Sequence, residues 1–367
     1  PQAHGVLYLG EFNLPGPNQP PVVYQWADKE KYVRVPTLYD VAFDAGLTTA
    51  ESDWVAITNA PKITWAFPEI PRVEGKVEQE MMAAGIITEE QIGWMQHRPG
   101  RKALVWHDEM WTKAACFMFK EHQPNLLLYH MLSIDWNHHY YGVGTEASHA
   151  AIAYADRLVG DIVQTVDESG LRDKTTFIIV SDHGFKKVTR YINLNVALKL
   201  AGLARANGPN LVECAAAVMS LGGVGCVYVT DPTRKAELLP KLRKMFGDVE
   251  GIARIIDGKE GPTVGMPSPE DDPRMGDLIL FAKEGYLFNN SAEGEDEVTP
   301  VVNYSSTHGY LASDPDMDGI FIATGAGIKK GVQLPRISSL DLAPTIAHLL
   351  GITMPEPEGR VIEEILL

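Results

Sequence analysis

The chain has 367 residues, of which 45% are hydrophobic and 22% are charged, and its formal net charge is −16. This is an ordinary globular composition, and the chain is long enough to bury a large core. The negative charge disfavours non-specific binding to nucleic acid or anionic lipid, although bound cations would allow an anionic substrate.

The chain contains no run of about 18 apolar residues, so we predict no membrane-spanning helix. No signal peptide is visible, but the first residue is Pro1 and we expect a segment upstream of it. The three cysteines, Cys116, Cys214 and Cys226, are too few for a disulfide scaffold, so we expect reduced thiols. The alternative is a Cys214–Cys226 disulfide in an oxidising compartment.

In chain order, apolar strand-like runs alternate with amphipathic helix-like runs. Strands are predicted at 47–57, 126–134, 175–180 and 319–325, and helices at 35–46, 146–168 and 338–351. In the helix at 146–168 the apolar positions recur with a spacing of about 3.6 residues, at Ile152, Ala155, Val159, Ile162, Val163 and Val166. Alternation of strand and helix predicts an α/β fold with a mainly parallel central sheet.

Residues 186–300 interrupt this alternation. They contain a strand pattern at 225–231, a short helix at 234–247, a loop rich in proline and acidic residues at 267–277, and an apolar run at 278–288. We therefore predict a core formed by residues 1–185 and 301–367, with residues 186–300 inserted as a smaller α+β subdomain.

Three segments place polar side chains at strand ends, at the sheet edge where α/β proteins form their sites. Asp135 and His139 are four residues apart, so they share one face if the chain is helical there. Asp182 and His183 follow the strand at 175–180, and His308 stands before a glycine.

Carboxylate and imidazole groups together suit zinc, with manganese or iron as alternatives. Five ligands exceed the three or four that one zinc ion takes from a protein, whereas two ions about 3.5–4 Å apart would use them all. The sequence therefore predicts two divalent metal ions of the kind that promote displacement at phosphorus.

These motifs resemble the alkaline phosphatase superfamily, and in particular its type I phosphodiesterase/nucleotide pyrophosphatase family. The resemblance rests on DHG at 182–184, on D-x-x-x-H-x-x-G at 135–142 and on THG at 307–309. The blocks at 154–185, 305–331 and 337–352 are similar to those of the family, so the likeness covers nearly the whole chain. It implies an alkaline-phosphatase-like three-layer α/β sandwich.

The resemblance also implies roles for the candidate ligands. Asp135, His139 and His308 would hold one metal ion, and Asp182 and His183 would hold the other. The family's remaining ligand and its nucleophilic threonine or serine precede a P-x-x-H-G segment, which here is PQAHG at residues 1–5. We therefore expect the nucleophile upstream of Pro1 and assign no catalytic nucleophile within this chain.

By the same resemblance, the expected activity is hydrolysis of a small phosphate ester or nucleotide by a phosphodiesterase or nucleotide pyrophosphatase. The substrate would not be a nucleic-acid polymer. A phosphomonoesterase, a phosphonoacetate hydrolase and a sulfatase-like hydrolase are alternatives within the superfamily. An alternative of another class is a non-catalytic metal-binding fragment or pseudoenzyme. Many relatives act outside the cytoplasm, so a periplasmic or secreted location is expected by analogy.

Overall fold

The computed structural model describes Tyr8, residues 10–96 and residues 104–367. The chain divides into two compact units, which we describe separately. Unit 1 comprises residues 1–34, 137–148 and 183–318, and unit 2 comprises residues 35–136, 149–182 and 319–367. The PQAHG segment with His4 lies outside the described residues.

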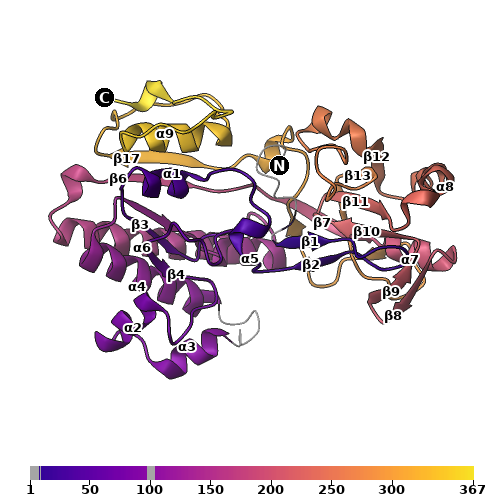
Figure 1. Cartoon of the computed structure of the whole chain (residues 1–367), viewed down its shortest axis with the longest axis horizontal. Helices are drawn as coiled ribbons and strands as arrows, with labels where there is room; N and C mark the ends of the chain where they lie inside the picture. Colours follow the sequence, from indigo (N-terminus) through magenta and orange to yellow (C-terminus); the bar gives the residue numbers. More distant parts are fainter. Residues whose placement is uncertain (1–7, 9, 97–103) are drawn as a thin grey trace. The chain divides into compact units, whose positions relative to one another are not determined.

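Unit 2 is built on short strands covered by helices (Figure 1). Its strands are β3 (Thr49–Ser52), β4 (Trp65–Phe67), β5 (Leu126–Tyr129), β6 (Thr176–Val180) and β17 (Phe321–Gly325). Its helices are α1 (Leu38–Asp44), α2 (Lys76–Ala83), α3 (Glu89–Gln96), α4 (Leu104–His122), α6 (Glu146–Glu168) and α9 (Leu342–Leu349). Strand β3 pairs in parallel with β4 and β5, whereas β6 pairs antiparallel with β17.

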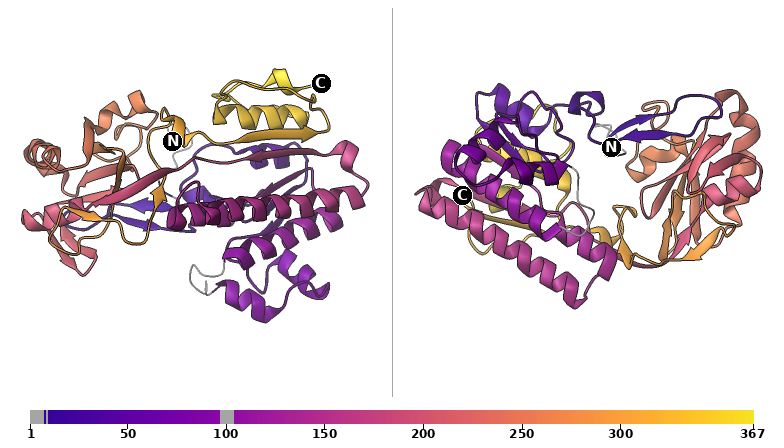
Figure 2. Two further views of the ribbon diagram at one scale, coloured as in Figure 1. Left: turned by 180° about the vertical axis from the view of Figure 1, so that it is seen from behind. Right: turned by 90° about the horizontal axis from the view of Figure 1, so that it is seen from below.

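Both faces of the parallel sheet in unit 2 are buried, and this explains the continuous apolar run in β5. Leu126 and Leu128 belong to a cluster with Tyr39 of α1 and Ile346 of α9. The alternate residues Leu127 and Tyr129 join a second cluster that contains side chains of α4. Successive side chains of a strand point to opposite faces, so an uninterrupted apolar run fills both layers. Helices α9 and α6 lie on opposite sides of β6 and β17 (Figures 1 and 2).

Unit 1 contains a four-stranded antiparallel sheet in the order β10 (Ala216–Ser220), β11 (Val224–Val229), β13 (Leu278–Ala282), β12 (Ile252–Asp257). A second sheet joins β7 (Lys186–Ile192) to β14 (Gly285–Phe288), β15 (Val298–Pro300) and β16 (Ser306–Thr307). The remaining elements are the hairpin strands β1 (Glu11–Asn13), β2 (Val22–Tyr24), β8 (Ala204–Asn207) and β9 (Asn210–Cys214), and the helices α7 (Leu194–Leu200) and α8 (Lys235–Gly247).

Strand β11 shows why unit 1 has apolar clusters on both faces of its four-stranded sheet. Val227 and Val229 pack into the cluster that includes residues of α7 and α8, whereas Cys226 and Tyr228 face the opposite cluster. Cys226 and Cys214 are buried, and all three cysteines are free, as predicted.

Helix α6 was predicted correctly in its extent, and its buried face was predicted correctly in part, since Ala155 and Val166 are buried. The observed bounds coincide with the predicted range, and Gly170 just beyond the end has a φ of +67°. Ile152, which we placed on the apolar face, is 46% exposed, while Ala151, Ala155 and Leu158 are buried. Periodicity sets the helix, but the side that faces the core depends on the neighbouring elements.

The strand predicted at 126–134 and the apolar run at 278–288 are each divided in the structure. The apolar run at 126–134 is a strand only to Tyr129, and helix α5 (Ser133–Tyr141) begins within the run. The run at 278–288 divides into β13 and β14, and Gly285, the first residue of β14, has a φ of +82°. In both places one continuous apolar stretch of sequence contains parts of two separate secondary-structure elements.

Candidate metal centre

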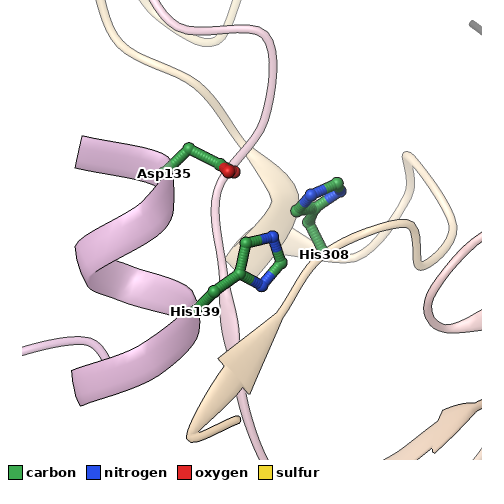
Figure 3. Close-up of side chains that lie close together, drawn as sticks. All are labelled: Asp135, His139 and His308. Carbon is green, nitrogen blue, oxygen red and sulfur yellow. The ribbon is translucent and has the colours of Figure 1, made fainter. Parts of the chain in front are cut away.

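Helix α5 carries two of the predicted ligands. Asp135 and His139 are one turn apart and point to the same side of the helix (Figure 3). The segment is helical, so the condition under which the two side chains share a face is met. His308 follows directly after β16 and points toward both side chains.

Asp135, His139 and His308 each offer one ligand atom, and these three atoms lie within 4.8 Å of one another. Within the residues that the structure describes, this is the group whose spacing suits a metal ion. A carboxylate with two imidazoles is a donor set that zinc and related divalent metals accept. The arrangement therefore fits the predicted first metal site.

Hydrogen bonds hold the segment before His308 against the C-terminal half of α5. Ser305 donates its backbone N–H to the carbonyl of His139 at 2.6 Å and its hydroxyl to the carbonyl of Tyr140 at 2.9 Å. The Ser306 hydroxyl donates to the carbonyl of His138. These contacts keep His308 near His139, although the two residues are far apart in the chain.

The tautomer of His139 follows from its partner. Its Nδ1 lies 3.0 Å from the backbone carbonyl of Ser306. A carbonyl only accepts hydrogen bonds, so Nδ1 carries the proton and the lone pair is on Nε2. Hydrogen bonding of the second ring nitrogen in this manner is typical of metal-binding histidines.

Burial, together with the neighbouring rings of His183 and His139, lowers the pKa of His308 to about 3. His308 is therefore neutral throughout the physiological pH range. A neutral imidazole is the form that binds metals, so no proton has to be displaced from this side chain.

Two glycine-containing turns bring the backbone of His308 close to a neighbouring loop. Gly309 has a φ of +79°, and a Cβ atom there would lie 1.7 Å from the carbonyl oxygen of Leu221. A Cβ atom on Gly222 would lie 2.1 Å from the carbonyl oxygen of His308, which accepts a hydrogen bond from the N–H of Gly223 at 3.1 Å. Only glycine permits this approach.

Asp182 and His183, the other predicted ligands, follow β6 directly. The ring of His183 stacks on His308 with centroids 3.7 Å apart, and its Nδ1 lies 3.1 Å from the carbonyl of Gly184. Neither residue belongs to the group of three close ligand atoms. Their role in a second metal site stays a prediction.

Phe185 lies among the histidine rings. Its ring centroid is 5.0 Å from that of His139, 5.4 Å from that of His183 and 5.3 Å from that of His308. The side chain packs against the site from within unit 1, and the apolar ring limits water around the imidazoles.

A group of buried acidic residues and histidines in unit 2 was not predicted from the sequence. Asp53 follows β3, His130 follows β5, and Asp53 Oδ2 lies 3.2 Å from His130 Nδ1. Burial favours the neutral form of His130, but the hydrogen bond and charge of Asp53 dominate and raise its pKa. The position of both residues at carboxyl ends of parallel strands was the signal available in the sequence.

Residues 1–311 match the model of the family "type I phosphodiesterase / nucleotide pyrophosphatase". The chain therefore belongs to this family and, with it, to the alkaline phosphatase superfamily. Within the described residues, no helix combines the length and apolar character needed to cross a membrane.

The chain is similar to several curated relatives. It is 26% identical over 233 residues to an ectonucleotide pyrophosphatase/phosphodiesterase of Caenorhabditis elegans, covering 63% of this chain and 25% of that protein. It is 27% identical over 224 residues to the bis(5'-adenosyl)-triphosphatase ENPP4 of Bos taurus, covering 56% of this chain and 39% of that protein. The chain thus spans between a quarter and two fifths of the length of these two relatives.

Its fold is similar to that of human ectonucleotide pyrophosphatase/phosphodiesterase 5, with a TM-score of 0.68 and 17% identity. The likeness covers 100% of this chain and 84% of that one. This agreement confirms the predicted alkaline-phosphatase-like α/β fold.

Proposed function

We propose that this chain forms the metal-binding part of a two-metal phosphate-ester hydrolase of the phosphodiesterase/nucleotide pyrophosphatase type. The observation that carries the proposal is the convergence of Asp135, His139 and His308. Membership of the family supports it. The substrate would be a small phosphate ester or nucleotide, in keeping with the names of the relatives.

The residues of the site fit a divalent cation. Asp135, His139 and His308 would hold one ion, and Asp182 with His183 would contribute to the second. The Nδ1 atoms of His139 and His183 lie at hydrogen-bond distance from backbone carbonyls, so both rings would present Nε2 to a metal. Zinc is the proposed metal, with manganese and iron as alternatives.

When bound, two such ions would lower the pKa of a hydroxyl nucleophile and balance negative charge on the phosphoryl oxygens. The protein's own part is to place the ligands and to keep the imidazole of His308 neutral. Bound cations would also let a protein of net charge −16 accept an anionic substrate. We assign no nucleophile to a residue of this chain.

Two further expectations remain proposals. Residues 186–300 would form a substrate-selecting subdomain beside a core of residues 1–185 and 301–367. A periplasmic or secreted location is proposed by analogy with relatives named as ecto-enzymes.

The metal site is tested by replacing His308 with alanine and measuring the bound metal per chain. We expect His308→Ala to lower the zinc content after dialysis, because one of three converging ligands is lost. His149→Ala is the matched control, since it removes an exposed imidazole from α6. Equal zinc content in His308→Ala and the unaltered chain would contradict the proposed ligand set.

The reaction is tested with bis(p-nitrophenyl) phosphate and p-nitrophenyl phosphate on the zinc-loaded protein that includes the segment in which the nucleophile is expected. Faster hydrolysis of the diester is the expected result. Equal or reversed rates would contradict a phosphodiesterase and favour a phosphomonoesterase. Tight zinc binding without hydrolysis of either compound would instead favour a non-catalytic metal-binding protein.

A further inference from the structure

A buried carboxylate lies at the start of the helix that carries two of the proposed ligands. Asp108, on α4, has a side chain that is 0% exposed. Its Oδ1 accepts the backbone N–H of Leu132 at 3.0 Å, and its Oδ2 accepts that of Ser133 at 3.0 Å. Helix α5 begins at Ser133, two residues before Asp135.

These two hydrogen bonds satisfy backbone N–H groups at the start of the helix. The first N–H groups of a helix have no partner within it, and a buried N–H without a partner is costly. A carboxylate at this end also interacts favourably with the helix dipole. Asp108 therefore caps the start of α5.

Asp108 is itself held in place. His107 Nδ1 lies 3.1 Å from Asp108 Oδ1, and the ring of His107 stacks on Trp111 with centroids 3.7 Å apart. His107 Nε2 lies 3.8 Å from Asp53 Oδ2, which pairs with His130. Asp53 itself adopts a φ of +59°, in the left-handed region.

The two ends of α5 are therefore held differently. Ser305 and Ser306 hold the half that carries His139, as described above. Asp108 holds the first turn, which carries Asp135. Loss of the Asp108 contacts would let the first turn shift, and Asp135 would leave its position one turn above His139.

We propose that Asp108 is a positioning residue that sets the first turn of α5 so that Asp135 completes a metal site with His139 and His308. This inference rests on the proposed function, because it assumes that these three residues bind a metal. Asp108 does not contact the metal in this scheme; it acts through the backbone of Leu132 and Ser133.

The test is titration of the metal-free full chain with Co²⁺, followed by calorimetry and by visible absorption, which reports the ligand geometry. We expect Asp108→Asn to weaken Co²⁺ binding by about 10–100-fold and to alter the absorption band. Asparagine preserves the shape but replaces one acceptor with a donor that opposes a backbone N–H.

Asp341→Asn is the matched control. Asp341 is also a buried carboxylate that accepts two backbone N–H groups, from Ser338 at 3.2 Å and Arg360 at 2.9 Å, but it precedes α9. We expect it to lower the melting temperature as Asp108→Asn does while leaving Co²⁺ binding unchanged. A purely structural role for Asp108 predicts that both variants bind Co²⁺ as the unaltered chain does, and that result would overturn the inference.

A second variant keeps the test decisive if Asp108→Asn does not fold. His107→Phe retains a ring beside Trp111 but removes the hydrogen bond to Asp108, and we expect several-fold weaker Co²⁺ binding. Unchanged affinity in His107→Phe would then overturn the inference. Absence of Co²⁺ binding in the unaltered chain is a separate result, since it would refute the proposed function on which the inference rests.

Discussion

Glu51 provides a sharp test of how burial controls charge in unit 2. It lies on β3, the middle strand of the parallel sheet, and is 1% exposed. The pKa of Glu51 is raised to about 8, mainly by burial. The nearby charges of Asp53 and Glu78 add to the rise, and the hydrogen bond from the Trp54 N–H opposes it. The ordinary value for the side chain is 4.5.

The sign of the resulting pH dependence follows from proton binding. Between pH 4.5 and about 8 the folded chain keeps the proton on Glu51 whereas the unfolded chain has released it. The stabilisation by this proton is complete below pH 4.5 and is lost as the pH rises through 8. Each pKa unit corresponds to about 1.4 kcal/mol, so the gap between 4.5 and about 8 gives an upper bound of about 5 kcal/mol.

Glu51→Gln removes the titration while keeping an oxygen to accept the Trp54 N–H. The unfolding free energy of both proteins should be measured by urea denaturation at intervals from pH 5 to 9. We expect the variant to gain stability relative to the unaltered chain as the pH rises, at up to about 1.4 kcal/mol per pH unit. The change of this difference with pH is the test, because it does not depend on how well the amide packs.

Glu121→Gln is the control, since Glu121 is an exposed residue of α4 and its replacement should leave the pH dependence nearly unchanged. The reasoning about Glu51 is refuted if Glu51→Gln and the unaltered chain lose stability in parallel between pH 5 and 9.

Two further substitutions test unit 1. Gly309→Ala should lower the unfolding free energy by more than about 1–2 kcal/mol, and it should also lower the zinc content. Both effects are expected because the added Cβ atom would collide with the carbonyl oxygen of Leu221. Gly294→Ala has a similar φ of +87° without a neighbour within 4 Å, so an equal loss in both variants would contradict a role for the close approach. Asn195→Ala should cost about 1–3 kcal/mol in urea denaturation, because Asn195 exchanges two hydrogen bonds of 2.9 Å with the backbone of Val218. A cost below about 0.5 kcal/mol would contradict this interpretation.

Local patterns in the sequence predicted the elements whose formation depends on neighbouring residues. The 3.6-residue spacing of α6 and its terminal Gly170 defined that helix, because side chains three and four apart share a face in any α-helix. The same geometry placed Asp135 and His139 together, since four residues make about one turn. These features can be predicted from the sequence because they depend only on residues that are close together in the chain.

Tertiary structure decided the features that depend on residues far apart in the chain. Strand β5 ends at Tyr129, and Asp108, more than twenty residues earlier, accepts the N–H groups at the start of α5. His308 meets His139 through backbone hydrogen bonds of Ser305, and no spacing in the sequence encodes that contact. The elevated pKa of Glu51 arises from removal of its carboxyl group from water. Helical spacing is a property of consecutive bonds, whereas desolvation and capping by a distant carboxylate exist only once the folded chain has brought the groups together.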